Sequence, residues 1–438
     1  MAKKKKLSDK RKLREFFQNT MADVRTAAPA CRHFGECGGC EFQDVPYAQQ
    51  LAAKRRAFDF IAECVDGDYN EKANACSEDD PVTAALLLAR AEELRNALTD
   101  LRIDIVASPA HLGYRQRMDY VFAFEKAGLR RANRHRQVVD LEECPLLGEQ
   151  GFAVFRKARK LAEAAGLESY DYMRHTGELR YFVVRRTRNG HVLLSLVTKT
   201  LNPKEEIRAV LETLVREGDI VSGHWLLAEG LGDVSFGTPQ LHVGQPLIVE
   251  EMNGLGLRIG PNTFFQSNPA VAEKAYAAIR DFTPAGARVL DMYSGVGSIA
   301  CNVAAGAGQV MAVENVPENV DLARENIDAN GLANVELRVD DSSRHLAVLA
   351  ADPALPRPDM VVVNPPRPGV EGDGMAAIKR LGPARLAYLS CNPFTLLRNL
   401  AEVADEYRLT SVTIYDMFPQ TRHFESLALL EKKDEGAL

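Results

Sequence analysis

The amino-acid sequence predicts an α/β protein with a doubly wound, Rossmann-like C-terminal domain, a β-rich central domain and an N-terminal cysteine-cluster segment. From about residue 265, short apolar runs alternate with helical patterns, which is typical of a parallel sheet covered by helices on both faces. Residues 102–250 instead carry β-branched and aromatic runs near turn signals such as Asn189-Gly190, and these predict an antiparallel sheet. Three cysteines within ten residues mark the N-terminal segment.

Apolar runs and helical periodicity give the expected elements of each part. In the C-terminal half we expect strands at Arg288–Met292, Gln309–Glu314, Val335–Val339, Asp359–Asn364 and Arg385–Ser390, with helices that include Glu318–Asn330 and Phe394–Glu406. In the central part we expect strands at Asp119–Phe124, Tyr181–Arg185 and His191–Val197, in a sheet with one basic, solvated face. Near the N-terminus, Tyr47–Cys64 reads as an amphipathic helix that places Lys54 on its polar side.

Shifts in composition divide the chain into five parts. We predict a flexible basic tail over 1–30 with a short helix around Lys12–Gln18, a cysteine-cluster segment over 31–65, a helical insertion over 66–101, a β-rich RNA-binding domain over 102–250 and a catalytic domain over 251–438. The insertion is acidic and rich in alanine, and we assign it no function.

Length and composition indicate a globular, water-soluble protein. A chain of 438 residues has room for two or three domains of roughly 150 residues each. No apolar run approaches the roughly 18 residues of a membrane span, and the basic N-terminus lacks the apolar core of a secretory signal. We therefore expect a cytoplasmic monomer without a membrane partner.

The net charge of −6 conceals two basic clusters. Residues 1–14 hold eight basic side chains, and residues 115–136 hold seven. Such clusters are the footprint of a polyanion such as RNA, although a solubilising tail and a solvated sheet face are the alternatives.

The cysteine loop, Cys31, Cys37 and Cys40, has a distant counterpart in Cys144. Four thiolates suit either an iron–sulfur cluster or a tetrahedral zinc ion. Disulfides are disfavoured because proteins without a secretory signal stay in compartments that keep thiols reduced. The sequence therefore predicts a metal centre held by these four residues.

A strand that runs into a glycine turn lies at Val289–Ser298, and the next strand ends in Glu314. In doubly wound folds such a turn lets a ligand approach the backbone, and the acid accepts hydrogen bonds from ribose hydroxyls. The turn holds two glycines, Gly295 and Gly297, whereas a dinucleotide-binding fingerprint has three. The motif suits S-adenosylmethionine, which has no phosphate to cradle, although a purely structural turn is the alternative.

A further cysteine, Cys391, lies at the C-terminal end of a predicted strand and just before a helix. Ligands of open α/β sheets bind at this edge, and a helix N-terminus favours the thiolate form. Asn364 begins the Asn-Pro-Pro-Arg turn that ends a neighbouring strand and faces the same crevice. Cys391 is therefore a candidate nucleophile, with a buried structural cysteine as the alternative.

Taken together, these motifs resemble those of the RNA uracil-5 methyltransferases, which form 5-methyluridine, including their iron–sulfur-containing bacterial 23S rRNA branch. The resemblance extends from Cys31 to about Leu430 except for the insertion. The motifs that carry it are the cysteine loop with Cys144, Phe264–Pro269, Asp291–Gly297, the Pro-Pro-Arg turn, Ser390–Leu396 and Asp416–Glu425.

The resemblance implies an S-adenosylmethionine-dependent methyltransferase that acts on ribosomal RNA, with transfer RNA as the second choice. It implies that Cys391 adds to C6 of the target uracil, which activates C5, and that Glu425 removes the C5 proton. It also favours a 4Fe–4S cluster over zinc. The positions that match the family's methyl-donor and base contacts are Gln266, Tyr293, Ser298, Glu314, Asp341 and Asn364.

Two departures from the family pattern bear on the substrate. Asn364 replaces the usual aspartate, whose carboxylate accepts a hydrogen bond from uracil N3–H. Because the asparagine amide adds a donor, cytosine is an alternative target base. The Asn-Pro-Pro sequence also resembles that of adenine-N6 methyltransferases. The thirty residues before Cys31 leave no room for a small N-terminal RNA-binding barrel, and we expect the lysine tail to supply part of that affinity. A catalytically silent RNA-binding or ribosome-assembly factor is disfavoured, because Cys391, Glu425 and the donor-site acids occur together.

Overall fold

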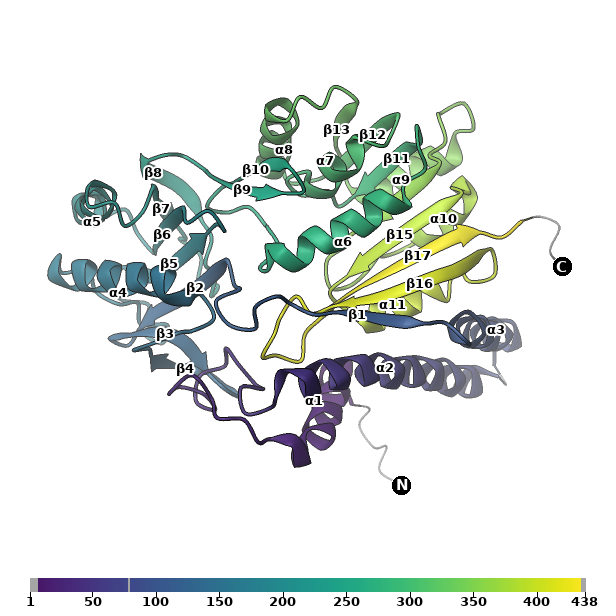
Figure 1. The fold of residues 1–438 in the computed structure, drawn as a ribbon, viewed down its shortest axis with the longest axis horizontal. Coiled ribbons are helices and arrows are strands. Elements are labelled where there is room, and N and C mark those ends of the chain that lie inside the picture. The colour runs from purple at the N-terminus through teal and green to yellow at the C-terminus, as the bar shows by residue number, and fades with distance from the viewer. Residues whose placement is uncertain (1–6, 78, 435–438) are drawn as a thin grey trace.

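The computed structural model describes residues 7–77 and 79–434. Figure 1 shows two sheets, one toward each end of the molecule, with the N-terminal helices packed along one side of the C-terminal sheet. Within the described residues, no helix is long and apolar enough to cross a membrane.

The C-terminal sheet is the expected doubly wound one, and its strand order is β1-β16-β17-β15-β14-β11-β12-β13. Strands β11 to β15 are parallel, while β17 runs antiparallel to both neighbours. The strands are β11 (Arg288–Met292), β12 (Gln309–Glu314), β13 (Val335–Val339), β14 (Met360–Val363), β15 (Arg385–Ser390), β16 (Tyr407–Tyr415) and β17 (Glu425–Lys432). The helices around them are α6 (Pro269–Phe282), α7 (Ser298–Ala304), α8 (Pro317–Ala329), α9 (Ser342–Ala351), α10 (Gly374–Leu381) and α11 (Pro393–Leu400).

Burial on both faces explains why the central strands of this sheet can be recognised in the sequence as continuous apolar runs. All four residues of β14 are buried, and each is methionine or valine. Helices cover both faces, so apolar side chains are favoured at every position rather than at alternate ones.

The central sheet has the strand order β4-β3-β2-β5-β6-β7-β8. Its elements are β2 (Arg117–Ala123), β3 (Lys126–Arg131), β4 (Arg134–Asp140), α4 (Gly148–Ala164), β5 (Leu179–Arg186), β6 (Val192–Thr198), α5 (Lys204–Arg216), β7 (Ser222–Leu227) and β8 (Thr238–Gly244). A small hairpin, β9 (Ile248–Met252) and β10 (Leu255–Ile259), leads into the C-terminal domain.

One expectation about this sheet was wrong, and another holds only in part. Strands β6 and β7 are parallel rather than antiparallel, because helix α5 makes the crossover between them. The expectation of one basic, solvated face holds in part: β5 and β6 are buried except for the half-buried Arg186, whereas β4 exposes Arg134 and Arg136. Part of the basic cluster is neutralised locally, since Arg130 pairs with Asp233 at 2.6 Å.

Strand β1 (Ile103–Val106) falls in the predicted central domain but pairs in parallel with β16, at the edge of the C-terminal sheet. The residues from 103 to 106 therefore belong with the catalytic half. Their pairing partner lies about three hundred positions later in the chain, which no local pattern reveals.

The N-terminal helices differ most from expectation. Helix α1 (Asp9–Thr20) is followed by a short 3-10 turn at Ala22–Val24, and α1 buries Leu13 and Phe17 in the core. The prediction of a flexible tail is wrong for this stretch, while residues 1–6 lie outside the described part. Helix α2 (Tyr47–Cys76) continues through the predicted boundary at residue 66 and packs against α3 (Pro81–Leu98), which Asp80 caps.

Candidate active site

The parallel strands bring the predicted site residues to one edge of the C-terminal sheet. Tyr293 follows β11, Glu314 ends β12, Asn364 follows β14 and Cys391 follows β15, and these strands are neighbours in the sheet. Because parallel strands end at the same edge, these four positions lie together at one edge of the sheet.

The glycine turn after β11 has the backbone that its sequence predicts. Gly295 and Gly297 have φ values of 56° and 77°, in the left-handed region that favours glycine. The Gly295 N–H donates to Glu314 at 2.9 Å, and the Val316 N–H donates to the other carboxylate oxygen at 2.9 Å. Glu314 thus joins two loops, and its remaining lone pairs can still accept from hydroxyls.

The other predicted donor contacts lie around this turn. The Tyr293 N–H donates to Ser342 at 3.2 Å, and Asp341 caps α9 by accepting from Arg344 N–H at 2.9 Å. Ser298 is the buried first residue of α7. Gln266 is buried and hydrogen-bonds Tyr276, whose pKa is raised by burial and also by the charges of Glu425 and Asp291.

Sheet register places Cys391 beside Glu425. Strands β15 and β17 are antiparallel with Ser390 opposite Ser426, so the next pair along the register is Cys391 and Glu425. Glu425 is 3% exposed, and Cys391 is half-buried at the start of the helix that follows β15. The two groups that the resemblance assigns to catalysis therefore face each other across neighbouring strands.

Both groups are largely neutral near pH 7. Burial, together with the charge of Glu425, raises the pKa of Cys391 to about 11, against a partial lowering by Arg367. Burial also raises the pKa of Glu425 to about 8, against a smaller lowering by Arg367. The expectation of a Cys391 thiolate was wrong, because desolvation and the facing carboxyl raise its pKa more than Arg367 and backbone hydrogen bonding lower it.

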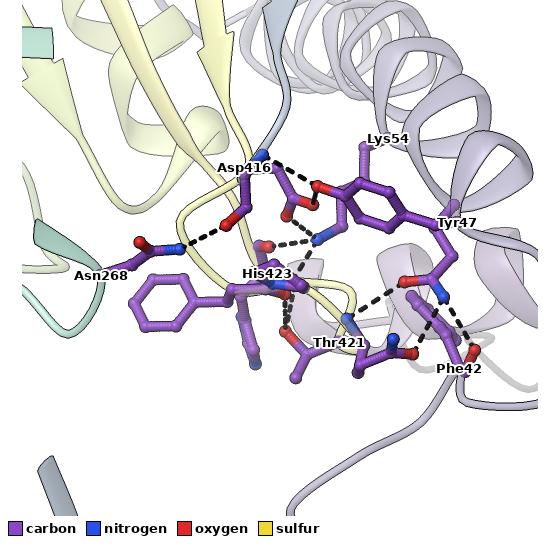
Figure 2. Close-up of polar contacts among 12 residues, drawn as sticks. Phe42, Tyr47, Lys54, Asn268, Asp416, Thr421 and His423 are labelled. Carbon is purple, nitrogen blue, oxygen red and sulfur yellow. Dashed lines mark hydrogen bonds and ion pairs between the residues drawn. The ribbon is translucent and has the colours of Figure 1, made fainter. Parts of the chain in front are cut away.

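The loop between β16 and β17 carries Arg422 and His423 and leads directly into Glu425. Figure 2 shows that Lys54, from α2, reaches into this loop. Its ammonium contacts Asp416 at 2.5 Å and donates to the carbonyls of Phe418 and His423, each at 3.0 Å. All three of its donors are therefore used on one loop.

Further contacts from the N-terminal segment hold the same loop. Tyr47 O–H donates to Asp416 at 2.7 Å, and the side chains of Gln50 and Gln420 are hydrogen-bonded at 2.9 Å. Glu41, one residue after Cys40, donates its N–H to Gln420 O at 2.7 Å and pairs through its carboxylate with Arg422 at 2.6 Å. The cysteine segment and α2 are thus structural parts of the catalytic edge.

Replacing Lys54 with methionine is expected to destabilise the protein strongly. Lys54 and Asp416 both have side chains that are 0% exposed, so the variant leaves a buried carboxylate without its cation. Breaking one side of a buried pair costs roughly 3–5 kcal/mol, which denaturant unfolding measures. The double variant Lys54→Met, Asp416→Asn should recover part of that loss; equal unfolding of Lys54→Met and the wild type would contradict the role assigned to this pair.

The four cysteines of the predicted metal centre lie together. Cys31, Cys37, Cys40 and Cys144 line one small cavity between the N-terminal loop and the central sheet, and Cys37 forms a β-bridge with Arg131 of β3. Burial raises the pKa of Cys31 to about 11 and that of Cys40 to about 12, and neighbouring thiols add to both shifts. No disulfide involves them, since all are free.

This arrangement does not establish a metal site. Among the described residues, no group of three or more His, Cys, Asp or Glu side chains is placed so that it could hold a metal ion. The type of side chain and the shared cavity nevertheless fit a thiolate-bound centre, because soft thiolates are the ligands that iron–sulfur clusters and zinc prefer.

Sequence patterns missed four residues of this site: Arg367, Lys54, Asp416 and Arg422. Arg367 stood in the Pro-Pro-Arg turn without a role, and its charge acts on both Cys391 and Glu425. The run that ends in Glu425 contained Asp416 and Arg422, but nothing local indicated their partners on α2 and in the cysteine segment.

Comparisons with known proteins bear on the family of this chain. The family model described as tRNA (Uracil-5-)-methyltransferase matches residues 240–433. The 23S rRNA (uracil(747)-C(5))-methyltransferase RlmC of Cronobacter sakazakii is 32% identical over 79% of this chain and 94% of its own length. The tRNA (uracil(54)-C(5))-methyltransferase of Pyrococcus abyssi is 27% identical over 92% of this chain and 85% of its own length.

A solved structure shows the same fold. The tRNA (uracil-54, C5)-methyltransferase of Pyrococcus abyssi, in complex with S-adenosyl-L-homocysteine, superposes with a TM-score of 0.68 at 24% identity, over 90% of this chain and 86% of that one. The family model and a relative above 30% identity, matched over nearly its whole length, establish the relationship. The chain therefore belongs to the S-adenosylmethionine-dependent RNA uracil-C5 methyltransferases.

Proposed function

We propose that this enzyme methylates a uridine of 23S ribosomal RNA at C5 through a covalent adduct between Cys391 and C6. The observation that carries the proposal is the register of β15 and β17, which sets Cys391 opposite Glu425 at the ligand-binding edge of the sheet. Uracil C5 is a poor nucleophile until a group adds at C6, so a thiol beside a base is the chemistry that this reaction requires.

The steps follow from these two residues. As the sulfur of Cys391 bonds to C6, its proton passes to solvent and the electrons of the C5–C6 double bond form an enolate. S-adenosylmethionine would supply the methyl as an electrophilic sulfonium substituent: the C5 electron pair bonds to the methyl carbon, the bond from that carbon to sulfur breaks, and S-adenosylhomocysteine leaves as a neutral thioether. Glu425 then removes the C5 proton, the double bond re-forms, and the sulfur of Cys391 leaves as a thiolate.

The donor site in this proposal is the glycine turn and its neighbours. Glu314 accepts from the ribose hydroxyls, as acids at this position do in doubly wound folds. Asn364 follows β14, the neighbour of the strand that precedes Cys391, and in this proposal it contacts the target base. The remaining contacts to the methyl donor are assigned to Gln266, Tyr293, Ser298 and Asp341.

Ribosomal RNA is favoured as the substrate because the relative named as a 23S rRNA enzyme is 32% identical, against 27% for the relative named as a tRNA enzyme. Nucleoside mass spectrometry of 23S rRNA and tRNA transcripts, incubated with the protein and S-adenosylmethionine, tests this directly. Methylation of tRNA alone would replace the substrate. Formation of 5-methylcytidine without 5-methyluridine would support the cytosine alternative that Asn364 raises.

We further propose that Cys31, Cys37, Cys40 and Cys144 hold a 4Fe–4S cluster, with zinc as the alternative. The support is the shared cavity and the thiol donor set. The centre would join the N-terminal loop to the central sheet, and the residue after Cys40 contacts the catalytic loop. Its proposed role is therefore structural.

Protein purified without oxygen is expected to be brown, with iron and sulfide in a ratio near one to one, as a 4Fe–4S composition requires. Cys37→Ala should bleach it and lower its melting temperature, because thiolates fixed by the cluster contribute folding free energy. Cys64→Ala, on α2 and outside the cavity, is the matched control. One zinc per colourless chain would overturn the iron–sulfur assignment.

A further inference from the structure

Helix α1 forms one wall of the cavity that contains Cys391. This cavity, of about 200 Å³, is lined by Cys391, Arg367, Arg422 and His423 on one side and by Asp9, Lys10 and Leu13 on the other. The basic N-terminal stretch, which sequence reasoning treats as a non-specific tail, therefore reaches the place where the target base must enter.

Ion pairs and burial fix α1 in this position. Asp9 pairs with Arg398 of α11 at 2.7 Å, and Lys12 pairs with Asp68 of α2 at 3.0 Å. Leu13 and Phe17 are 9% and 2% exposed. Since α11 begins at Pro393, two residues after Cys391, the anchoring of α1 to α11 sets the position of Lys10 relative to the nucleophile.

Lys10 adds to a concentration of positive charge around this cavity. Lys10 and Arg367 are exposed, while Arg422 is 13% exposed and pairs with Glu41. Burial lowers the pKa of His423 to about 3, and the charges of Arg422, Arg367 and Lys10 are among the further causes. Within the part of the chain that the structure describes, Asp9 and Lys12 have ion-pair partners but no carboxylate pairs with Lys10.

Lys10 and Arg367 line the same cavity and, unlike Arg422, pair with no carboxylate among the described residues, so an anion that joins them would be stabilised. A nucleotide whose base enters the cavity carries its own phosphates to the mouth, because enzymes that modify a base take it out of the stack while its backbone stays outside. Phosphate oxygens bind lysine and arginine and so position the RNA.

We propose that Lys10, together with Arg367 and Arg422, binds the RNA phosphate adjacent to the target nucleotide, so that α1 is part of the substrate-binding site. This inference rests on the proposed function. It assigns to α1 a contact with one particular RNA phosphate rather than a non-specific affinity for RNA.

Lys10→Ala and Arg11→Ala form a matched pair that tests it. Each removes one positive charge from the same helix, but Arg11 is 65% exposed, pairs with Glu15 and lies outside the cavity lining. Lys10→Ala is expected to raise KM for 23S rRNA transcript about tenfold or more, since a charged hydrogen bond contributes about 1.5–3 kcal/mol, with kcat changed less than about twofold. Arg11→Ala should stay within about twofold of the wild type, and Lys10→Arg should restore most of the affinity.

Filter binding of the same transcript, with S-adenosylhomocysteine present, provides a second readout that does not depend on methylation. Equal weakening by Lys10→Ala and Arg11→Ala would overturn the proposal, because the effect would then be bulk electrostatics. A fall in kcat at unchanged KM would also overturn it. A wild-type protein that methylates no uridine would refute the proposed function, and the binding comparison would still decide the role of Lys10.

Discussion

Cys391→Ala is expected to abolish methylation of uridine. Without the thiol no adduct forms at C6, and C5 stays unreactive toward the methyl donor. Loss of a catalytic nucleophile typically lowers kcat by at least about a thousandfold, which tritium transfer from labelled S-adenosylmethionine measures easily.

The matched control is Cys76→Ala. Cys76 is a free thiol at the end of α2, outside the lining of the cavity that contains Cys391, and its replacement should leave kcat and KM unchanged. Unfolding curves for both variants should resemble that of the wild type, since Cys391 is only half-buried. Sustained turnover by Cys391→Ala would refute the covalent mechanism.

Glu425→Gln is expected to stop the reaction after methyl transfer. The amide is nearly the same size as the carboxyl but cannot take the C5 proton, so the enzyme stays covalently attached to RNA that contains ordinary uridine. Denaturing gel electrophoresis with labelled RNA should show this complex, with turnover below one methyl group per enzyme.

The pH dependence of the wild type follows from the same residue. A base acts when deprotonated, so a pKa near 8 for Glu425 predicts a rate that rises as pH increases through about 8. Cys391 and Arg367 face Glu425, and the Cys391 thiol, whose pKa is raised to about 11, is mostly protonated near pH 8, so that its thiolate fraction also increases with pH there. Glu431→Gln, on the same strand but paired with Arg408 at 2.9 Å, is the control and should keep the wild-type profile. Normal turnover by Glu425→Gln would remove this residue from the mechanism.

The sequence predicts the five parallel strands β11 to β15 well, because they are short runs that end at glycine, proline or acidic residues, but β1, β16 and β17 of the same sheet were not among the expected strands. Four of the five expected strands have the observed bounds, and the remaining one, β14, is shorter by one residue at each end. The convergence of Glu314 and Cys391 at one edge follows from parallel topology alone.

What the sequence did not predict depends on contacts between distant segments. Helical periodicity assigns Lys54 to a polar face, yet the residue is fully buried against Asp416, which is 362 positions away. The prediction of a Cys391 thiolate considered the helix N-terminus but not the burial or the facing Glu425. The packing of α1 on the catalytic edge was not predicted for the same reason, since Arg398, the ion-pair partner of Asp9 in α1, lies 389 positions away.

The most direct test of the covalent mechanism is mass spectrometry of the complex formed with RNA that carries 5-fluorouridine at the target position. Fluorine at C5 cannot leave as a cation, so Glu425 has no proton to remove and the adduct persists. We predict one stable adduct per enzyme, a methylated fluoropyrimidine linked to the peptide that contains Cys391, and none with Cys391→Ala. Methylation of ordinary uridine by a protein that forms no such adduct, or forms it on another cysteine, would contradict the mechanism.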